Sequence, residues 1–284
     1  MPRPLAPALP ASPMPELPEV ETTRRGMLPH VVGRTVRRVV VRDPRLRWPV
    51  SADLPARLEG RRVEGISRRG KYLLFDFGNG CLLVHLGMSG SLRFLARPEL
   101  PRAHDHVDLE LDDRSLIRLT DPRRFGAMLW AGKRPEAHAL LKDLGPEPLG
   151  EGFSGRHLFN RSRGRSVAVK QFVMDAHTVT GIGNIYASEA RFHAGIHPSR
   201  AAGRIALPRY ERLAAAIRDT LERALSAGGS TLRDFVGSDG RPGYFQHESA
   251  VYGREGLACR SCSTAIRASR HGSRSTYFCP RCQH

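Results

Sequence analysis

Four of the five cysteines stand in two close pairs near the end of the chain. Cys259 and Cys262 are separated by two residues, as are Cys279 and Cys282, and sixteen residues lie between the pairs. This spacing is typical of a site in which four thiolates surround zinc at about 2.3 Å. Two disulfides are the alternative, but the regular spacing favours one structural Zn2+ in a reducing compartment. Cys81 stands alone in an apolar stretch and is interpreted as a small buried hydrophobe.

The residues between the two cysteine pairs are rich in arginine. Arg267, Arg270 and Arg274 occur there beside Tyr277. A small hairpin that carries guanidinium groups next to an aromatic ring is suited to contact nucleic acid. By themselves, the cysteines and arginines indicate a zinc ribbon that binds nucleic acid or protein.

The whole chain is strongly basic, with 284 residues, a net charge of +17 and a pI near 10.8. Such a field attracts polyanions. Nucleic acid is the first candidate and an anionic membrane surface the second, because no basic amphipathic helix with an aromatic face is evident. No apolar run approaches the length that spans a bilayer, so a soluble protein is expected. Nearly all the cations are arginine, and the four lysines are Lys71, Lys133, Lys142 and Lys170.

Periodic patterns divide the chain into a β-rich part and a helical part. A helix is expected over 16–30, where Pro18 suits a first turn and acidic residues follow. The runs that then predict an antiparallel sandwich or barrel are 35–42, 61–67, 71–77, 81–86, 106–111 and 115–119. Helical periodicity follows over 135–143, 154–160, 167–175, 184–194 and 208–226.

We therefore expect an α+β multidomain protein. The predicted domains are a β-rich domain over 14–132, a helical domain over 133–236 and a loop with a metal module over 237–284. Residues 1–13 are rich in Pro and Ala and lack the basic start and apolar centre of a signal peptide. They are interpreted as the product of a misplaced start codon, with a cleaved leader as the alternative.

Short motifs in a fixed order carry a family resemblance from Met14 to His284. They are PELPEVET, RRGKYLL, HLGMSGSLR, HDHVDL, TDPRRFGA, LGPEPL, GIGNIYASE, SDGRPGYF and VYGREG, followed by the four cysteines. Together they resemble the formamidopyrimidine-DNA glycosylases, bacterial enzymes of base excision repair. The resemblance implies an N-terminal antiparallel β-sandwich, a helix–two-turns–helix domain and a zinc-finger β-hairpin, with DNA in the cleft between them. The ELPEVE opening, the context of Met88 and the Arg-Arg-Phe sequence resemble the purine-directed branch more than the endonuclease VIII branch, which prefers oxidised pyrimidines.

The resemblance assigns the nucleophile to Pro15. In this family the proline after the initiator methionine attacks the anomeric carbon of the damaged nucleotide and forms a Schiff base. A proline nitrogen inside a chain is an amide and cannot attack, whereas a terminal proline is an amine with a pKa near that of α-amino groups, about 7.7–8.0. The active protein is therefore expected to begin at Met14, with that methionine removed. Pro2 is a poor substitute, because Arg3 and Pro4 follow it instead of an acid.

Four further residues match catalytic groups of the family. Glu16 matches the proton donor, and burial near phosphates would raise its pKa; the alternative is an acid favoured at the N-terminus of its own helix. Glu19 matches an orienting or water-handling acid. Lys71 matches the lysine of base release and β-elimination, with an ordinary solvated lysine as the alternative. Arg274 matches the donor in δ-elimination.

Excision from a duplex requires extrusion of the damaged nucleotide, and the vacated stack has to be filled. The resemblance implies that Met88 is the apolar filler, Arg123 the donor to the orphaned cytosine and Phe125 the aromatic wedge. The alternatives are a core methionine and a core phenylalanine. The segment 238–245 is expected to close over the extruded base.

Phosphate contacts are expected at five positions. Asn184 precedes a helical pattern, where its side chain and the unpaired amides can receive a phosphate oxygen or where it is an N-cap. The complete set is His104, Arg123, Arg165, Lys170 and Asn184.

The resemblance implies a bifunctional DNA glycosylase and apurinic/apyrimidinic lyase. Its partner would be double-stranded DNA that contains oxidised purines such as 8-oxoguanine and formamidopyrimidines, and β,δ-elimination would follow excision. A monomer in the bacterial cytoplasm is expected, without a membrane partner and without a nucleotide or redox cofactor. Two alternatives stay open: a non-catalytic zinc-dependent DNA-binding protein, if residues 1–13 persist, and a glycosylase with endonuclease VIII specificity.

Overall fold

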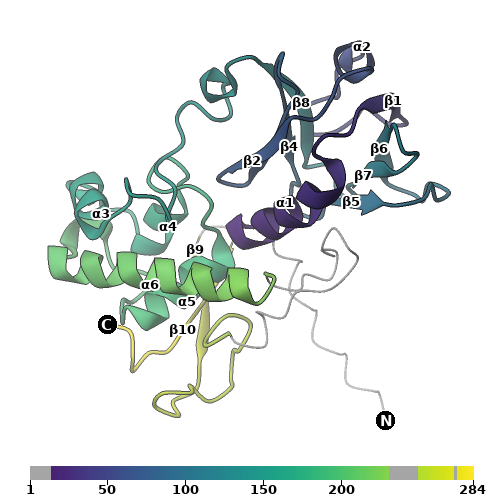
Figure 1. The fold of residues 1–284 in the computed structure, drawn as a ribbon. Coiled ribbons are helices and arrows are strands. Elements are labelled where there is room, and N and C mark those ends of the chain that lie inside the picture. Colours follow the sequence, from purple (N-terminus) through teal and green to yellow (C-terminus); the bar gives the residue numbers. More distant parts are fainter. Residues whose placement is uncertain (1–13, 230–248, 272–273) are drawn as a thin grey trace, which may run out of the picture.

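The computed structural model describes residues 14–229, 249–271 and 274–284 (Figure 1). In these ranges the N-terminal strands form two antiparallel four-stranded sheets, which confirms the predicted sandwich. The first sheet has the strand order β1-β6-β7-β5 and the second has the order β2-β3-β4-β8. The strands are β1 (Val36–Val41), β2 (Gly65–Arg69), β3 (Tyr72–Asp76), β4 (Cys81–His85), β5 (Ser91–Leu95), β6 (Asp105–Leu111), β7 (Leu116–Thr120) and β8 (Ala127–Gly132).

Two of these strands, β5 and β8, were not predicted, and a third begins later than predicted. Strand β8 is an apolar run without alternation, and β5 follows directly on a glycine-containing turn. Strand β2 begins at Gly65 rather than at residue 61, because residues 61–63 bond instead to the segment around Arg34–Val36. The short helix α2 (Leu54–Leu58) was also not predicted.

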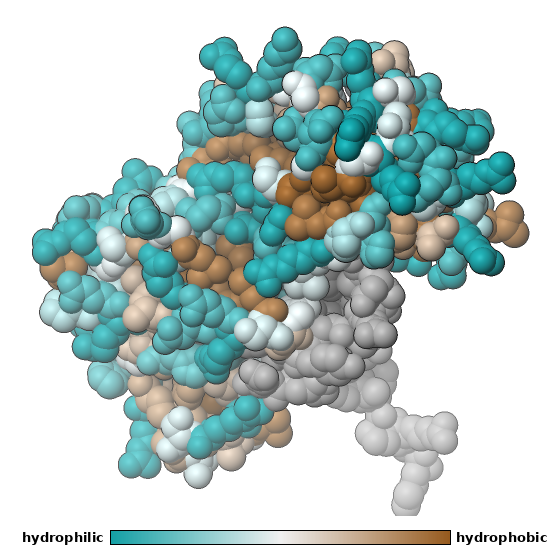
Figure 2. All heavy atoms as spheres, in the orientation of Figure 1, coloured by the Kyte–Doolittle hydropathy of each residue, from teal (hydrophilic) through white to brown (hydrophobic). Residues whose placement is uncertain are grey.

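Helix α1 (Leu17–Val31) leads into the sandwich and confirms the helix expected over 16–30. Pro18 lies in its first turn, where the missing N–H has no helical acceptor to lose. The apolar side chains of Leu17, Val20 and Met27 are fully buried. The helix packs against β2 and β5 of the two sheets and against the last long helix of the chain. Figure 2 shows hydrophilic residues over most of this face, with hydrophobic residues gathered in the middle of the view.

The helical part contains α3 (Gly155–Ser162), α4 (Val169–Met174), α5 (Asn184–His193) and α6 (Leu207–Ser226), with a 3-10 turn at Ala202–Arg204. All four helices were predicted. Helix α6 packs on α3, α5 and α1, and its buried residues join one core that also includes the sandwich. Among the described residues, no helix has both the length and the apolar character that a membrane span requires.

The helix predicted over 135–143 was wrong. The structure has a single 3-10 turn at Pro135–Ala137, followed by irregular turns. Of the apolar side chains in this stretch only that of Leu141 is buried, so a helix here would have no apolar face to pack. The ring of His138 accepts the N–H of Leu140 and so supports a turn instead.

The C-terminal module consists of a hairpin between the two cysteine pairs. Strands β9 (Arg267–His271) and β10 (Arg274–Phe278) pair antiparallel. The four sulfur atoms lie within 4.8 Å of one another, and the closest pairs are 3.5 and 3.9 Å apart. A tetrahedron with metal–sulfur bonds of about 2.3 Å has edges of about 3.8 Å, so this arrangement fits zinc, whereas disulfide bonding requires about 2.05 Å. The module has a small core that it shares with Phe192 of α5, and a metal ion would reinforce this core.

We expect one zinc ion per chain, and Cys279→Ala should abolish stoichiometric binding because three thiolates cannot close the tetrahedron. Elemental analysis measures the zinc content, and limited proteolysis reports the folding of residues 249–284. Cys81→Ala is the matched control, because Cys81 is also a buried cysteine without a disulfide bond but lies in β4, outside the cluster of four sulfur atoms. Full zinc content in Cys279→Ala would contradict the assignment.

Candidate active site and nucleic-acid interface

The carboxyl group of Glu16 lies at the N-terminus of α5, a helix that begins more than 160 residues later in the chain. Its oxygens accept the backbone N–H groups of Gly183 at 2.6 Å, Ile185 at 2.9 Å and Tyr186 at 3.4 Å. The first amides of a helix lack helical acceptors and carry positive partial charge, so they favour an acid. Glu16 therefore caps α5, and it is also the N-cap residue of its own helix α1, the position that the alternative in the sequence analysis gave it.

Two glycines make this close approach possible. A Cβ atom on Gly183 would lie 2.4 Å from the carboxyl carbon of Glu16, and one on Gly181 would lie 2.8 Å from the side chain of Leu17. Gly181 also has a φ of +83°, which favours glycine, and its carbonyl accepts the N–H of Leu17 at 2.9 Å. The GIGN sequence thus allows the segment that begins at Pro15 to lie directly on the start of α5.

A second buried carboxylate supports the first. Glu19 accepts the backbone N–H of Glu16 at 2.9 Å and the hydroxyl of Tyr186 at 2.6 Å. Glu16 and Glu19 are both almost completely buried, and Pro15 is buried beside them. The structure therefore places the three N-terminal residues that the sequence analysis selected in one enclosed cluster, and it adds Tyr186, which was not predicted.

Lys71 lies in the two-residue turn between β2 and β3. Gly70, the first residue of the turn, has a φ of +57° and approaches Thr180 so closely that a Cβ atom would lie 2.2 Å from its hydroxyl oxygen. In tight hairpins, a position that requires a positive φ is usually occupied by glycine. The turn is therefore fixed against the segment that precedes α5, and this contact determines where Lys71 lies.

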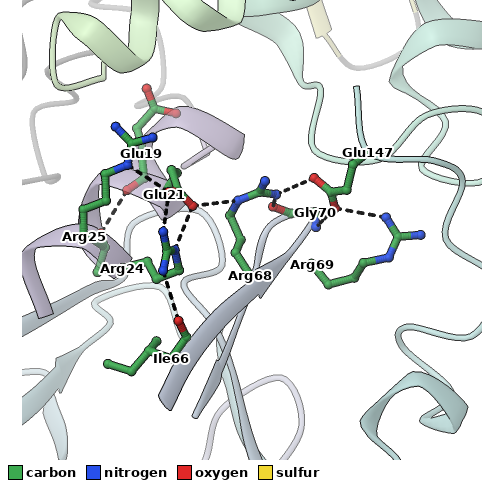
Figure 3. Close-up of polar contacts among 10 residues, drawn as sticks. Glu19, Glu21, Arg24, Arg25, Ile66, Arg68, Arg69, Gly70 and Glu147 are labelled. Atoms are coloured by element: carbon green, nitrogen blue, oxygen red, sulfur yellow. Dashed lines mark hydrogen bonds and ion pairs between the residues drawn. The ribbon is translucent and has the colours of Figure 1, made fainter. Parts of the chain in front are cut away.

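An ion-pair network holds the same turn from the other side (Figure 3). Glu147 accepts the N–H of Gly70 at 2.6 Å, Arg69 at 3.0 Å and Arg68 at 2.7 Å. Arg68 also reaches Glu21 of α1 at 3.2 Å. The network thereby links α1, the turn that carries Lys71 and the LGPEPL segment. Neither Glu147 nor the arginines were predicted, although the RRGKYLL and LGPEPL motifs contain them.

The electrostatics of the cluster couple residues from three parts of the fold. Burial raises the pKa of Glu16 to about 7; the positive charge of Lys71 and the bonds to α5 oppose this rise, and Glu19 reinforces it. Burial also lowers the pKa of Lys71, opposed by Glu16 and reinforced by the charge of Arg274 at the start of β10. Lys71 therefore interacts electrostatically with both Glu16 and Arg274, as residues that share one site should.

Two neighbouring loops carry Met88, Arg123 and Phe125. A Cβ atom on Gly87 would lie 2.5 Å from the carbonyl carbon of Phe125, so the backbones of the two loops touch. The buried carboxylate of Asp121 joins them, because it accepts the hydroxyl of Ser89 and the N–H of Gly126.

The side chains on these loops are accessible. That of Phe125 is 40% exposed, which argues against the core alternative, and Met88 is partly buried. The guanidinium of Arg123 lies 5.3 Å from the centre of the Phe125 ring. The structure thus brings the three residues to one place.

The remaining predicted phosphate contacts differ in their environment. His104 and Arg165 are exposed, and Asn184 is the partly exposed first residue of α5. Lys170 is buried, and its ammonium donates to the carbonyl of Ser275 at 2.7 Å and to the hydroxyl of Thr276 at 2.6 Å. Lys170 therefore fixes the zinc module to α4, a role that the sequence analysis did not foresee. The segment 238–245 lies outside the described residues.

Two buried charges that support the site were missed. Glu189 of α5 accepts the backbone N–H groups of Ala250, Val251 and Tyr252 and so anchors the VYGREG segment. Arg118 of β7 binds the carboxylates of residues 105 and 108 and two carbonyls of the loop that precedes residue 104. The motifs GIGNIYASE and HDHVDL marked both regions as important, but they did not indicate which residues Glu189 and Arg118 bind.

Comparison with known proteins agrees with this geometry. Residues 14–128 match the family described as formamidopyrimidine-DNA glycosylase N-terminal domain. Residues 144–236 match the formamidopyrimidine-DNA glycosylase H2TH domain, and residues 256–284 match a zinc finger found in FPG and IleRS. The chain belongs to the formamidopyrimidine-DNA glycosylase family. It is therefore a DNA glycosylase of base excision repair, with a zinc finger that holds one structural zinc.

Relatives match over nearly the whole chain. The formamidopyrimidine-DNA glycosylases of Syntrophotalea carbinolica and Stutzerimonas stutzeri are each 58% identical over 270 residues, which is 95% of this chain and 100% of theirs. The crystal structure of the MutM (Fpg) protein from Thermus thermophilus has a TM-score of 0.85 at 42% identity, covering 95% of this chain and 98% of that one. A Lactococcus lactis Fpg in complex with DNA that contains an abasic site has a TM-score of 0.88 at 32% identity, covering 94% and 99%.

We expect Gly183→Ala to displace the Glu16 carboxyl, because the new methyl group would occupy its place. A shift of about 1 Å at a reacting group costs about 100-fold in rate. Single-turnover base excision should fall by that order, and the melting temperature should also decrease. Gly65→Ala is the control, since a Cβ atom there meets nothing within 4 Å. Wild-type excision by Gly183→Ala would show that the contact is not needed.

Proposed function

We propose that the protein removes oxidised purines, including 8-oxoguanine and formamidopyrimidines, from double-stranded DNA and then cleaves the strand at the abasic site. The observation that carries this proposal is the cluster around Glu16. A buried carboxyl with a pKa near 7 directly follows Pro15; the charge of Lys71 acts on it, and the charge of Arg274 acts on Lys71. Related structures support the substrate class, because they are complexes with DNA that contains Fapy-dG or carbocyclic 8-oxo-G.

Pro15 is the proposed nucleophile. The family match begins at residue 14, which supports a mature chain that exposes the Pro15 nitrogen as a secondary amine. That amine would attack the anomeric carbon, the base would depart with a proton, and the opened sugar would remain bound as an iminium. Glu16 would donate the proton at the sugar, since its raised pKa keeps a fraction of the carboxyl protonated at neutral pH.

Strand cleavage would use the cations of the cluster. Lys71 would accept and pass protons during base release and β-elimination, and its lowered pKa suits this exchange. Arg274 would hold the phosphate that leaves in δ-elimination. Loss of both phosphates leaves a gap of one nucleotide. Glu19 would orient Glu16 and a water molecule through the hydrogen bonds described above.

The proposed DNA contacts surround this cluster. Met88 and Phe125 would fill the vacated stack, and Arg123 would donate to the orphaned cytosine. His104, Arg165 and Asn184 would contact phosphates from their accessible positions. Lys170 is bonded to β10, so it would contact only a phosphate that lies against that strand. We also propose that the enzyme acts as a monomer in the bacterial cytoplasm, where its DNA substrate lies.

Trapping with borohydride tests the nucleophile. Reduction of the iminium on a duplex with 8-oxoguanine opposite cytosine should give a covalent adduct, and mass spectrometry should locate it at a chain that starts with Pro15. A chain that retains residues 1–13 is the matched control and should give no adduct, because its proline nitrogen is an amide. Absence of an adduct when Pro15 is terminal would refute the enzyme and favour a non-catalytic DNA-binding protein. Preference for oxidised pyrimidines would indicate the endonuclease VIII specificity.

The pH dependence of excision tests Glu16. Because its pKa is raised to about 7, the carboxyl is a proton donor below that pH, and the single-turnover rate should fall as the pH rises above 7. The proline amine has the opposite requirement, so the complete profile should be bell-shaped. Glu16→Gln should lower base excision by about 100- to 10,000-fold and remove the alkaline limb. An unchanged profile in Glu16→Gln would assign that limb to another group.

A further inference from the structure

We infer that Asp43 is a positioning residue for the loop that carries Arg123 and Phe125, and that its contact with Arg124 governs how readily the enzyme opens a duplex. The inference rests on the proposed function, because it provides the support for residues that would fill the vacated stack. Asp43 follows strand β1, more than 80 residues before Arg124 in the chain.

The loop between β7 and β8 has a backbone that needs support. Arg124 stands between the two side chains of interest and has a φ of +57°, a left-handed conformation that is unfavourable for a residue with a Cβ atom. Within the loop, the Arg124 N–H donates to the carbonyl of Asp121 over a long 3.3 Å. This weak hydrogen bond within the loop does little to stabilise the left-handed conformation of Arg124. A contact from outside the loop is therefore needed to stabilise it.

Asp43 supplies that contact. Its carboxylate accepts Arg124 at 2.8 Å on one oxygen. Arg45 holds the same carboxylate through its backbone N–H at 3.0 Å, its Nε at 2.8 Å and its Nη2 at 2.9 Å. Because Arg45 alone makes three hydrogen bonds to this carboxylate, the orientation of Asp43 does not depend on Arg124. Arg124 is thereby drawn toward β1, whereas Arg123 and Phe125 on either side of it remain exposed.

The segment that carries Asp43 is itself rigid. Leu46 and Val50 are buried in the main core. Trp48 forms a parallel β-bridge with Ala127, the first residue of β8. The segment thus contacts the end of the loop between β7 and β8, which is the loop that Asp43 also contacts. Because the segment is anchored in the core, it fixes the position of this loop relative to the sandwich.

The expected effect is limited to reactions that require the duplex to be opened. Nothing in the described structure connects Asp43 with Glu16 or Lys71, so the chemistry itself should not depend on it. A single strand has no stack to fill, and an abasic site in it should be cleaved equally well with or without the contact. Ion pairs near the surface contribute little free energy, so loss of this contact should change the rate only roughly fivefold.

Asp43→Asn and Arg124→Gln test the contact, each alone and combined. Each should lower the single-turnover excision of 8-oxoguanine from a duplex roughly fivefold, and the double variant should lose no more than either single variant, because both remove the same interaction. Cleavage of a single-stranded abasic oligonucleotide should keep the wild-type rate. Asp43→Glu should restore part of the duplex activity.

Asp53→Asn is the matched control. Asp53 is an acid near the surface that likewise binds arginine, but its partner Arg57 lies on α2. Wild-type duplex activity in Asp43→Asn would overturn the inference, as would an equal loss on single-stranded and duplex DNA. If the wild-type protein fails to excise 8-oxoguanine from the duplex, the proposed function fails instead, whatever the variants do.

Discussion

A buried carboxyl group at the start of helix α5 joins the two halves of this protein. Glu16 belongs to the segment that leads into the sandwich, and its acceptor oxygens satisfy amides 167 to 170 residues further along the chain. The same placement removes the carboxyl from water, and this burial raises its pKa to about 7 although the hydrogen bonds to α5 oppose the rise. One buried group thus connects the domains and supplies the proposed proton donor next to Pro15.

The surrounding structure is arranged to keep this contact close. Gly181 and Gly183 allow the N-terminal segment to touch α5, and Gly70 allows the β2–β3 turn to touch Thr180. Glu147 then holds that turn through three hydrogen bonds. Glu16 and the turn that carries Lys71 are thus each fixed by partners from distant parts of the chain. Such preorganisation reduces the rearrangement needed when a substrate binds.

The positive charge is distributed unevenly between the two domains. Many arginines of the sandwich are paired with carboxylates, including those in the networks of Glu21, Asp108 and Glu147. None of the arginines between residues 150 and 229 forms an ion pair with a carboxylate of the residues that the structure describes. A net charge of +17 therefore acts in two ways: in the sandwich it helps to hold loops in place, and in the helical domain the exposed arginines can attract phosphates.

The sequence by itself determined the features that depend on local spacing. The zinc cysteines, helix α1, the four helices of the second domain and most of the strands follow from short-range periodicity, and the ordered motifs identified the family. Tertiary structure alone decided the features that depend on distant partners. It placed Glu16 on α5 and Lys170 against β10, and it left residues 135–143 without an apolar surface that would have stabilised a helix. A spacing rule describes neighbours along the chain, whereas a buried charge or a helix face is stabilised by residues that only folding brings near.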